Sequence, residues 1–394
     1  MAKVRMGMVG GGPDAFIGQI HRMAAGLDGN IELVCGVFSR NNDKNQQAAD
    51  ILSLSSNRVY ADFQTMFDAE KKLPADERME FVSIVTPNDS HHAIASAAIE
   101  AGFHVFCEKP ATFNLAESES LAKQLQQSNS LFGLAHTYCG YPLVREAKHR
   151  VAQGEIGEVK KIVVEYSQGW LAKKLNNDGG KQGAWRLDPK SAGISCCVGD
   201  IGVHAANLAE YIGGSEIEHI LADLGSVVEG RTLDDDATVL LRFANKARGV
   251  LLSSQISLGE ENNLKIQVYG SLGTLSWSQQ EPNSLWLLPG DKPAQLIRAG
   301  FDYLCPAAQA CTRTPAGHPE GYIEAFANLY KHFSQAVVDH RDNTVANSQP
   351  DGVPGIKEAV IGMRFIEGTV QSSNANNSWL QLNTLNSKSM ETNS

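Results

Sequence analysis

Residues 4–18 read VRMGMVGGGPDAFIG, and their pattern is the first indication of the fold class. A short apolar run over residues 4–9 meets three consecutive glycines, and helical spacing follows over residues 19–27. A strand, a glycine-rich turn and a helix in this order are typical of a dinucleotide-binding βαβ unit, because glycines let the backbone approach a pyrophosphate and the helix offers free N–H groups. Gly10 and Gly12 match the first two positions of Gly-x-Gly-x-x-Gly, but the third glycine comes late, at Gly18. An ordinary glycine turn therefore stays open as an alternative.

Apolar runs and helical patterns alternate through the first part of the chain. The expected strands are residues 4–9, 31–38, 59–60, 81–85, 105–107 and 131–136, and the expected helices between them are residues 19–27, 44–52, 63–71, 93–101 and 116–127. This alternation predicts an α/β fold with a doubly wound Rossmann domain over residues 1–136. Ligands of such sheets bind at the carboxyl ends of the strands.

Polar side chains follow several of these strands and are expected at that edge. Lys109 directly follows Val105-Phe106-Cys107-Glu108, although strands of this composition normally end in turn residues. A surface lysine remains the alternative to a catalytic one. After the second strand come Ser39 and Arg40, where an NAD-type fold places an acid on the ribose 2′-hydroxyl. Serine and arginine suit a 2′-phosphate, so the sequence favours NADP over NAD, with a helix cap and a solvent-facing arginine as the alternative.

Beyond residue 136 strand-like runs follow one another with few helices between them. They cover residues 160–167, 217–224, 237–243, 247–256, 265–268, 274–277 and 284–288. We expect an α+β domain over residues 137–383 with a large, mostly antiparallel, open-faced sheet, and a disordered tail over residues 384–394. An exposed sheet face is often covered by a second subunit, which predicts a homodimer or homotetramer.

Residues 199–212 have helical spacing and end at Gly213-Gly214. Asp200 and His204 are four residues apart and Asn207 follows three later, so a helix presents all three on one face. A packed histidine is the ordinary interpretation of His204 taken alone. Asp-x-x-x-His is also half of a metal site, but no further ligands are placed with it, and we expect no metal.

The chain resembles the Gfo/Idh/MocA oxidoreductases. The resemblance rests on Thr86-Pro87-Asn88-x-x-His91, on residues 101–105 leading to Glu108-Lys109-Pro110, on Asp200-x-Gly202-x-His204, and on Val268-Tyr269-Gly270-x-x-Gly273. It implies that Lys109, Asp200 and His204 are catalytic and that the Lys109–Pro110 bond is cis. Asn207 departs from an aspartate that is frequent in the family, so a substrate contact there is neutral.

The residues expected to bind the cofactor are Gly10, Gly12, Phe16, Ile17, Ser39, Arg40, Thr86, Pro87, Asn88, His91, Glu108 and Lys109. The residues expected near the substrate are His136, Tyr138, Trp170, Lys181, Trp185, Arg186, Asn207 and His318. The run Asp234-Asp235-Asp236 is expected to be a solvated turn without chemistry.

Composition excludes several classes of protein. A net charge of −10 without a basic stripe argues against a nucleic-acid partner. No apolar stretch approaches the ~18 residues of a membrane span, and the first residues enter a strand pattern directly, so we expect a cytoplasmic protein without a membrane partner. The seven cysteines include no Cys-x-x-Cys pair and are expected to be reduced, mostly buried thiols.

The pattern as a whole predicts hydride transfer between nicotinamide C4 and a secondary hydroxyl of a sugar, sugar derivative or cyclitol. His204 is the expected base for the hydroxyl proton, Lys109 a donor to the reacting oxygen, and Asp200 an orienting carboxylate. Two alternatives stay open. One is an NAD-dependent glycoside hydrolase that oxidises C3 transiently, and the other is a non-catalytic sugar-sensing regulator.

Overall fold

The computed structural model describes residues 3–13, 15–173, 185–344 and 352–385. The chain forms two compact units. The first consists of Met1–Phe113, Glu117–Thr137 and Phe326–Val360, and the second of Asn114–Ala116, Tyr138–Ala325 and Ile361–Ser394. Lys181 and residues 386–394, which include most of the expected tail, lie outside the described residues.

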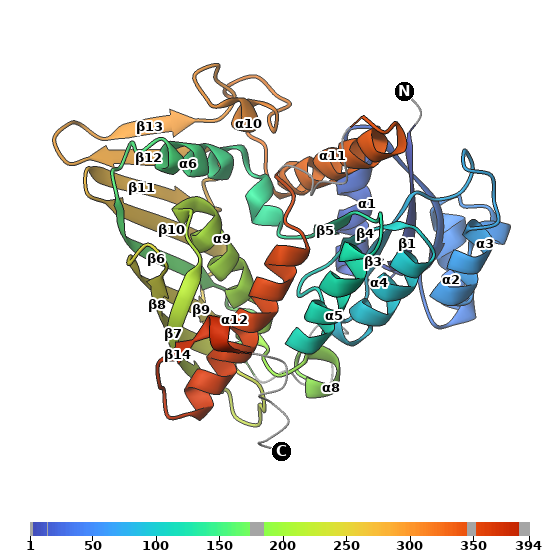
Figure 1. Cartoon of the computed structure of the whole chain (residues 1–394), viewed down its shortest axis with the longest axis horizontal. Coiled ribbons are helices and arrows are strands. Elements are labelled where there is room, and N and C mark those ends of the chain that lie inside the picture. The colour runs from blue at the N-terminus through green and yellow to red at the C-terminus, as the bar shows by residue number, and fades with distance from the viewer. Residues whose placement is uncertain (1–2, 14, 174–184, 345–351, 386–394) are drawn as a thin grey trace. The chain divides into compact units, whose positions relative to one another are not determined.

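A five-stranded parallel sheet forms the centre of the first unit, in the order β2-β1-β3-β4-β5 (Figure 1). Its strands are β1 (Val4–Gly10), β2 (Ile31–Val37), β3 (Phe81–Val85), β4 (His104–Cys107) and β5 (Phe132–Leu134). The doubly wound fold is confirmed, but the strand expected at residues 59–60 is only an isolated bridge between Val59 and Gly36. The extended stretch is too short for a strand, because the chain leaves a 3₁₀ turn at Arg58 and Asp62 already caps the next helix.

Helices cover both faces of this sheet. They are α1 (Phe16–Gly26), α2 (Asn42–Ile51), α3 (Phe63–Glu70), α4 (His91–Glu100), α5 (Leu115–Gln126) and α11 (Tyr322–Arg341). Side chains of β3 alternate between the faces, as the pleat requires. Val82 and Ile84 lie in the core cluster with residues of α3, α4 and α5, whereas Phe81 and Ser83 contact Tyr330 of α11. α11 lies beside α1 in Figure 1, and the rings of Phe326 and His21 are 4.6 Å apart.

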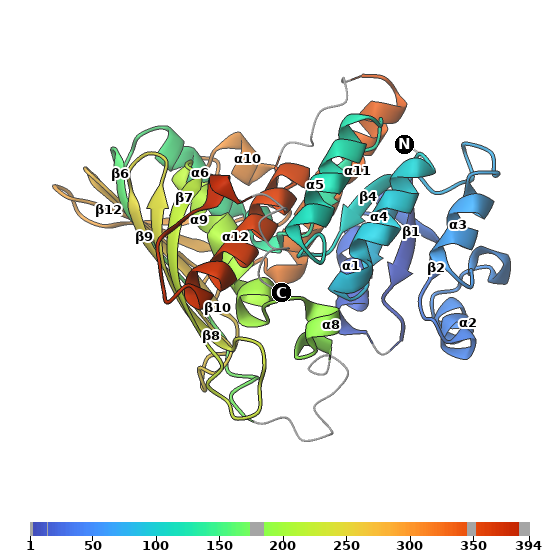
Figure 2. The same cartoon turned by 60° about the horizontal axis from the view of Figure 1, so that its bottom comes forward.

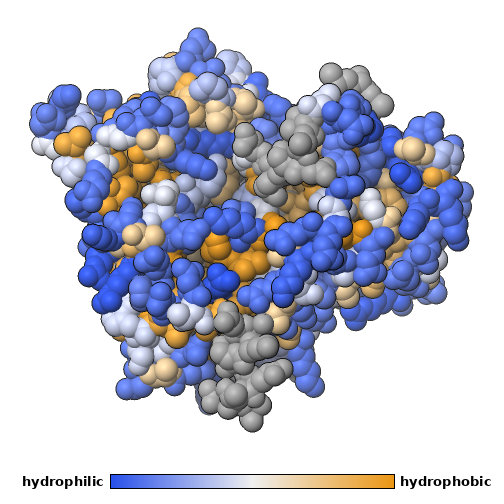
Figure 3. All heavy atoms as spheres, in the orientation of Figure 1, coloured by the Kyte–Doolittle hydropathy of each residue, from blue (hydrophilic) through white to orange (hydrophobic). Residues whose placement is uncertain are grey.

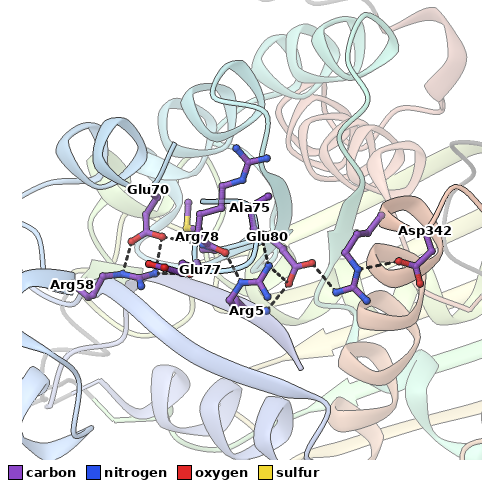
Figure 4. Close-up of polar contacts among 10 residues, drawn as sticks. Arg5, Arg58, Glu70, Ala75, Glu77, Arg78, Glu80 and Asp342 are labelled. Atoms are coloured by element: carbon purple, nitrogen blue, oxygen red, sulfur yellow. Dashed lines mark hydrogen bonds and ion pairs between the residues drawn. The ribbon is translucent and has the colours of Figure 1, made fainter. Parts of the chain in front are cut away.

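Ion pairs join α11 to the amino ends of two strands of the parallel sheet (Figure 4). Glu80, just before β3, accepts from Arg5 of β1 at 3.1 Å and from Arg341 of α11 at 3.2 Å. Arg58 donates a bidentate pair of hydrogen bonds to the Glu70 carboxylate, at 2.7 and 2.8 Å. The Glu70 side chain is buried, so removing Arg58 would leave an uncompensated charge in the core.

A nine-stranded sheet forms the second unit, in the order β13-β12-β11-β10-β6-β9-β8-β7-β14. Every neighbouring pair is antiparallel except β6 and β9, which are parallel. The mostly antiparallel sheet is therefore confirmed. Its strands are β6 (Val159–Ser167), β7 (Ile217–Gly225), β8 (Asp236–Phe243), β9 (Arg248–Ser254), β10 (Asn263–Gly270), β11 (Gly273–Ser278), β12 (Ser284–Pro289), β13 (Gln295–Arg298) and β14 (Leu380–Gln381).

Helices pack on one face of this sheet, as Figures 1 and 2 show. They are α6 (Pro142–Ala152), α9 (Val203–Gly213), α10 (Pro306–Gln309) and α12 (Ile356–Asn374), and the short helix α8 (Pro189–Ala192) precedes α9. On the other face, residues paired across neighbouring strands form a row at one level. In strand order the row is Leu296, Trp286, Ser276, Gln267, Val163, Val250, Leu240 and Leu221. All eight are exposed or partly exposed, so the described residues leave this face open.

The surface and the cysteines fit the composition. Hydrophilic side chains predominate on the face drawn in Figure 3, with hydrophobic ones between them. The seven cysteines are free and buried, as expected. In the part of the chain that the structure describes, no helix combines the length and the apolar character of a membrane span.

The run of aspartates at residues 234–236 is not a solvated turn, so this expectation was wrong. Asp234 and Asp235 are 7% and 0% exposed, and Asp236 begins β8. Backbone N–H groups from two separate loops converge on their carboxylates, which stabilises the buried charge. The N–H donors to Asp234 are 36 and 38 residues away and those to Asp235 are 7 and 8 residues away, so the run of three acids by itself does not reveal them.

Candidate active-site residues

The glycine-rich turn after β1 is packed too closely for side chains. A Cβ atom at Gly10, whose φ is +91°, would lie 2.6 Å from the carbonyl oxygen of Val85, and one at Gly12 would lie 2.7 Å from that of Phe38. A Cβ at Gly18 would lie 2.2 Å from the Cα of Gly11. The turn is thus wedged between the ends of β2 and β3, and the late glycine lets α1 pack directly on it.

The first turn of α1 carries Phe16 and Ile17, and their N–H groups have no partner within the helix. This combination of bare backbone and a helix N-terminus fits a pyrophosphate. After β2, the Ser39 hydroxyl accepts from the N–H of Asn41 at 3.1 Å, and Arg40 is exposed. No acid occupies residues 38–41.

His91 links the loops that follow β3 and β4. It is fully buried at the start of α4, with Nε2 2.8 Å from the carbonyl oxygen of Thr86 and Nδ1 2.8 Å from that of Pro110. Burial lowers the pKa of His91, although both carbonyl contacts oppose this shift. Asn88 is buried beside this link, and Pro87 is exposed. The ring therefore fixes one predicted cofactor loop against another.

Glu108 belongs to a buried polar chain in the first unit. Its Oε1 lies 2.8 Å from Nε2 of His21, whose Nδ1 lies 2.6 Å from the hydroxyl of Tyr330. That hydroxyl lies 2.8 Å from Ser83 Oγ. Burial raises the pKa of Glu108, but the hydrogen bond to His21 and the charge of Lys109 outweigh it, so its pKa lies below the ordinary value. The carboxylate is ionised and held in one orientation.

Lys109 is partly buried, and its N–H donates to Glu108 Oε2 at 3.0 Å. The Lys109–Pro110 peptide bond is cis, as the resemblance implied. Burial lowers the pKa of His136 to about 3, and the positive charge of Lys109 acts in the same direction while Glu108 opposes it. His136 is therefore neutral near pH 7, and the field of Lys109 reaches it.

Asp200 does not lie in a continuous α-helix, so this part of the sequence prediction was wrong. Residues Val198–Gly202 form a π-helical turn, η4, and α9 begins only at Val203. π-Helical turns are frequent at functional sites, and the wider turn changes the angle between Asp200 and His204. Asp200 Oδ2 accepts from Gln255 Nε2 at 2.9 Å and is 3.3 Å from Arg186 Nε.

Aromatic and amide groups surround His204, which is 8% exposed. Its ring makes an edge contact with Tyr138 at 5.0 Å. The hydroxyls of Tyr138 and Tyr166 share a short hydrogen bond, and both contact Asn262, at 3.2 and 2.7 Å. A closed triangle of hydrogen bonds thus supports one side of the imidazole.

The remaining candidates in the second unit lie in different settings. Asn207 Oδ1 accepts from the Cys139 thiol at 3.1 Å. Trp170 is 40% exposed, and its Nε1 donates to Gln168 at 2.8 Å. The Trp185 ring lies under the Arg186 guanidinium at 4.4 Å, so Trp185 and Asp200 both contact this arginine. His318 is exposed, and its Nδ1 lies 3.2 Å from the carbonyl oxygen of Pro315.

Several site residues were not found from the sequence. They are His21, Tyr166, Asp234, Gln255, Asn262 and Tyr330. Each acts through a partner far along the chain, 309 residues away for the contact between His21 and Tyr330. The one signal in the local sequence was His21, a histidine within the helix that follows the glycine turn. Among the described residues, no group of three or more His, Cys, Asp or Glu side chains is placed to hold a metal ion.

Comparison with known proteins identifies both parts of the chain. Residues 4–136 match the model of the oxidoreductase family with an NAD-binding Rossmann fold, and residues 144–276 match that of the GFO/IDH/MocA C-terminal domain. The uncharacterized oxidoreductase YfiI of Bacillus subtilis is 32% identical over 383 residues, which cover 96% of each chain.

Solved structures with the same fold extend over nearly the whole chain. An inositol dehydrogenase homologue of Azotobacter vinelandii complexed with NAD⁺ is 34% identical, with a TM-score of 0.92 over 96% of this chain and 97% of that one. Its complex with NADH and myo-inositol gives 33% identity and a TM-score of 0.89 over 96% and 98%. An oxidoreductase of Sinorhizobium meliloti is 40% identical, with a TM-score of 0.86 over 97% and 100%. The chain therefore belongs to the Gfo/Idh/MocA family of NAD-binding oxidoreductases.

Proposed function

We propose that this oxidoreductase transfers hydride between nicotinamide C4 and a carbon bearing a secondary hydroxyl of a sugar, a sugar derivative or an inositol. The observation that carries the proposal is the pair Asp200 and His204 on consecutive helical turns, with Gln255 and Arg186 on the carboxylate. Such acid, amide and guanidinium groups suit a polyol, whose hydroxyls both donate and accept. The Azotobacter homologue, solved with NADH and myo-inositol, supports this substrate class.

The first unit would hold the dinucleotide at the carboxyl ends of its strands. The bare turn at Gly10 and Gly12 and the start of α1 suit the pyrophosphate, and the loop of Thr86 and Asn88 follows the neighbouring strand. His91 is buried, so we assign it the positioning of these loops rather than direct contact. The nicotinamide supplies the hydride acceptor or donor.

Side chains of the protein would accept the substrate's hydroxyl proton and stabilise the charge that develops on its oxygen. In the oxidation direction the hydroxyl proton must leave as hydride departs, so a group whose pKa is near neutrality must accept it. We assign this role to His204, whose ring is supported by Tyr138. Lys109 donates a hydrogen bond to the reacting oxygen and stabilises negative charge that develops there. Asp200 orients the imidazole or a substrate hydroxyl, and its charge favours the imidazolium.

The form of the cofactor is a separate proposal. The Azotobacter structures contain NAD⁺ or NADH. In this chain residues 38–41 lack the acid that would bind a ribose 2′-hydroxyl, so we propose that Ser39 and Arg40 bind the 2′-phosphate of NADP. Fluorescence titration with NADPH and NADH tests this directly. Tighter binding of NADH would contradict it.

The substrate proposal is tested by screening inositols, monosaccharides and glycosides with both cofactors while the absorbance of the reduced nicotinamide is followed. We expect turnover of at least one polyol with net reduction of the cofactor. An aryl glycoside belongs in the same screen. Release of its aglycone without net cofactor reduction, together with no oxidation of any polyol, would replace the dehydrogenase proposal by glycoside hydrolysis.

We also propose that the open face of the nine-stranded sheet binds a second copy of the chain. The row from Leu296 to Leu221 is apolar except for Ser276 and Gln267, and its Leu296, Trp286 and Leu240 are exposed. Solvation of such side chains is unfavourable, and burying them against an identical face removes apolar surface from water. A homodimer, or a homotetramer built from two such pairs, follows from this arrangement.

A further inference from the structure

Four consecutive residues, the last of them the first residue of the π-helical turn, donate hydrogen bonds to a single aspartate. The carboxylate of Asp234 accepts from Ser195 Oγ at 3.0 Å, from the N–H of Cys196 at 2.8 Å and from the N–H of Val198 at 2.9 Å. The carbonyl oxygen of Asp234 accepts from the N–H of Cys197 at 3.1 Å. Each residue from Ser195 to Val198 is thus held by a hydrogen bond to Asp234, either to its carboxylate or to its backbone carbonyl oxygen.

The same contacts continue to the Asp200 side chain. Asp200 donates its N–H to the carbonyl oxygen of Cys196 at 2.8 Å. The Cys196 thiol donates to Gln255 Oε1 at 3.5 Å, which leaves Gln255 Nε2 facing the carboxylate of Asp200 at 2.9 Å. Gln255 is fully buried and has one orientation that satisfies both contacts. A displacement of Cys196 therefore moves both the backbone and the hydrogen-bond partner of Asp200.

The π-helical turn depends on such anchoring. The first N–H groups of any helix lack intrahelical partners, and a π turn is less stable than an α turn of the same residues. Ser195 contributes a second time, because its Oγ accepts from the N–H of Gly199 at 3.1 Å. The start of η4 is buried, so water does not replace these partners.

We propose that Asp234 is a positioning residue for catalysis, holding the π-helical turn so that Asp200 and His204 keep their working geometry. In this role Asp234 itself touches no substrate. The kinetic consequences of this role rest on the proposed function, whereas its structural part, the effect of Asp234 on the π-helical turn and on His204, does not.

Asp234→Asn is the direct test, and Asp235→Asn is its matched control. An amide at residue 234 faces its NH₂ toward an N–H or O–H donor in either orientation, so at least one contact becomes repulsive. Asp235 is equally buried, and its carboxylate also accepts three hydrogen bonds, from the N–H groups of Val227 and Val228 and from Arg231. These donors belong to a different loop, so the control removes a comparable set of buried hydrogen bonds while the donors to Asp234 keep their acceptor. The backbone contact from the Gln255 N–H to the Asp235 carbonyl oxygen, at 2.9 Å, does not involve the substituted side chain.

The kinetic expectation is a fall in kcat of about 10- to 100-fold for Asp234→Asn, with NAD(P)H affinity unchanged. The pH dependence of kcat/KM should shift as well, because the field of Asp200 at His204 changes. Asp235→Asn should lose similar stability and keep both kcat and the pH profile. Equal kcat values in the two variants would overturn the proposal.

A readout independent of turnover separates this inference from the proposed function. With histidine labelled in the ring, the His204 signal is identified by its loss in His204→Gln, and its pKa is then measured by NMR. We expect that pKa to move in Asp234→Asn and to stay in Asp235→Asn. If the wild-type protein oxidises no polyol, the proposed function fails, and the His204 titration alone decides the role of Asp234.

Ser195→Ala serves if Asp234→Asn does not fold. It removes one donor to Asp234 and the acceptor for Gly199. Ser226→Ala is its control, since Ser226 Oγ donates to the carbonyl oxygen of Leu233, at 2.8 Å, and not to the Asp234 carboxylate. We expect the His204 pKa to move in Ser195→Ala and not in Ser226→Ala. No movement in either would overturn the proposal.

Discussion

Gly18 offers the sharpest test of how the cofactor turn is built. In Gly18→Ala the new Cβ would stand 2.2 Å from the Cα of Gly11 and 3.0 Å from its carbonyl carbon and oxygen. Carbon atoms in contact prefer about 3.5–4.0 Å, so the turn and α1 must separate by roughly 1.3 Å or more. The obstacle is backbone, which has no alternative rotamer.

The expected cost follows from that displacement. Overpacking of this kind destabilises by about 1–3 kcal/mol, and a shift of ~1 Å at a positioned site costs up to ~10²-fold. We therefore expect the Kd for NAD(P)H, measured by fluorescence titration, to rise at least about tenfold, which equals roughly 1.4 kcal/mol.

Gly26→Ala is the matched control for this prediction. Gly26 ends the same helix, and no atom lies within 4 Å of its added Cβ. Alanine there should leave cofactor affinity unchanged and raise stability by about 0.5–1 kcal/mol. If Gly18→Ala binds the cofactor as tightly as Gly26→Ala does, the close packing of Gly18 on Gly11 does not position the cofactor turn.

Three further predictions concern stability, assembly and cofactor choice. Burial, together with the charge of His340, lowers the pKa of His104 from 6.5 to about 4 in the folded protein. Between pH 6.5 and pH 4 the unfolded chain binds this proton and the folded protein does not, so the free energy of unfolding falls as the pH falls. His104→Asn, which keeps an acceptor for the N–H of Leu131, should flatten the urea-unfolding free energy in this range by up to about 1.4 kcal/mol per pH unit, and equal slopes in both proteins would contradict this. Leu240→Lys should shift the sedimentation coefficient toward that of the monomer, whereas Leu258→Lys, on an exposed loop, should not. An unchanged sedimentation coefficient in Leu240→Lys would contradict the role of the open face in assembly. Arg40→Ala should weaken NADPH about tenfold and leave NADH unchanged, and equal losses for both would remove Arg40 from the choice.

The parallel sheet was predictable because its signals are local. The run 81–85, FVSIV, is apolar except for Ser83, and the glycines at 10–12 mark the turn after β1. Lys109 and Thr86 follow neighbouring strands, so the carboxyl-end rule places them at one edge without knowledge of side-chain contacts.

The support of the candidate site was not predictable for a physical reason. The spacing of Asp200 and His204 fits an α-helix, and nothing local reveals the π turn, because Asp234 and Gln255 stabilise it from distant segments. The charge run at 234–236 has the composition of a solvated turn, and only the converging N–H groups make its burial favourable.

We propose that Lys109 acts on the reacting oxygen while the cofactor carries out the redox chemistry. Single-turnover reduction of saturating cofactor by an oxidisable polyol measures this step in Lys109→Ala, with Lys123→Ala on the exposed side of α5 as the control. We predict cofactor affinity within about twofold of wild type and hydride transfer slower by about 10²- to 10³-fold in Lys109→Ala alone. Hydride transfer at the wild-type rate in Lys109→Ala would contradict this role of the lysine.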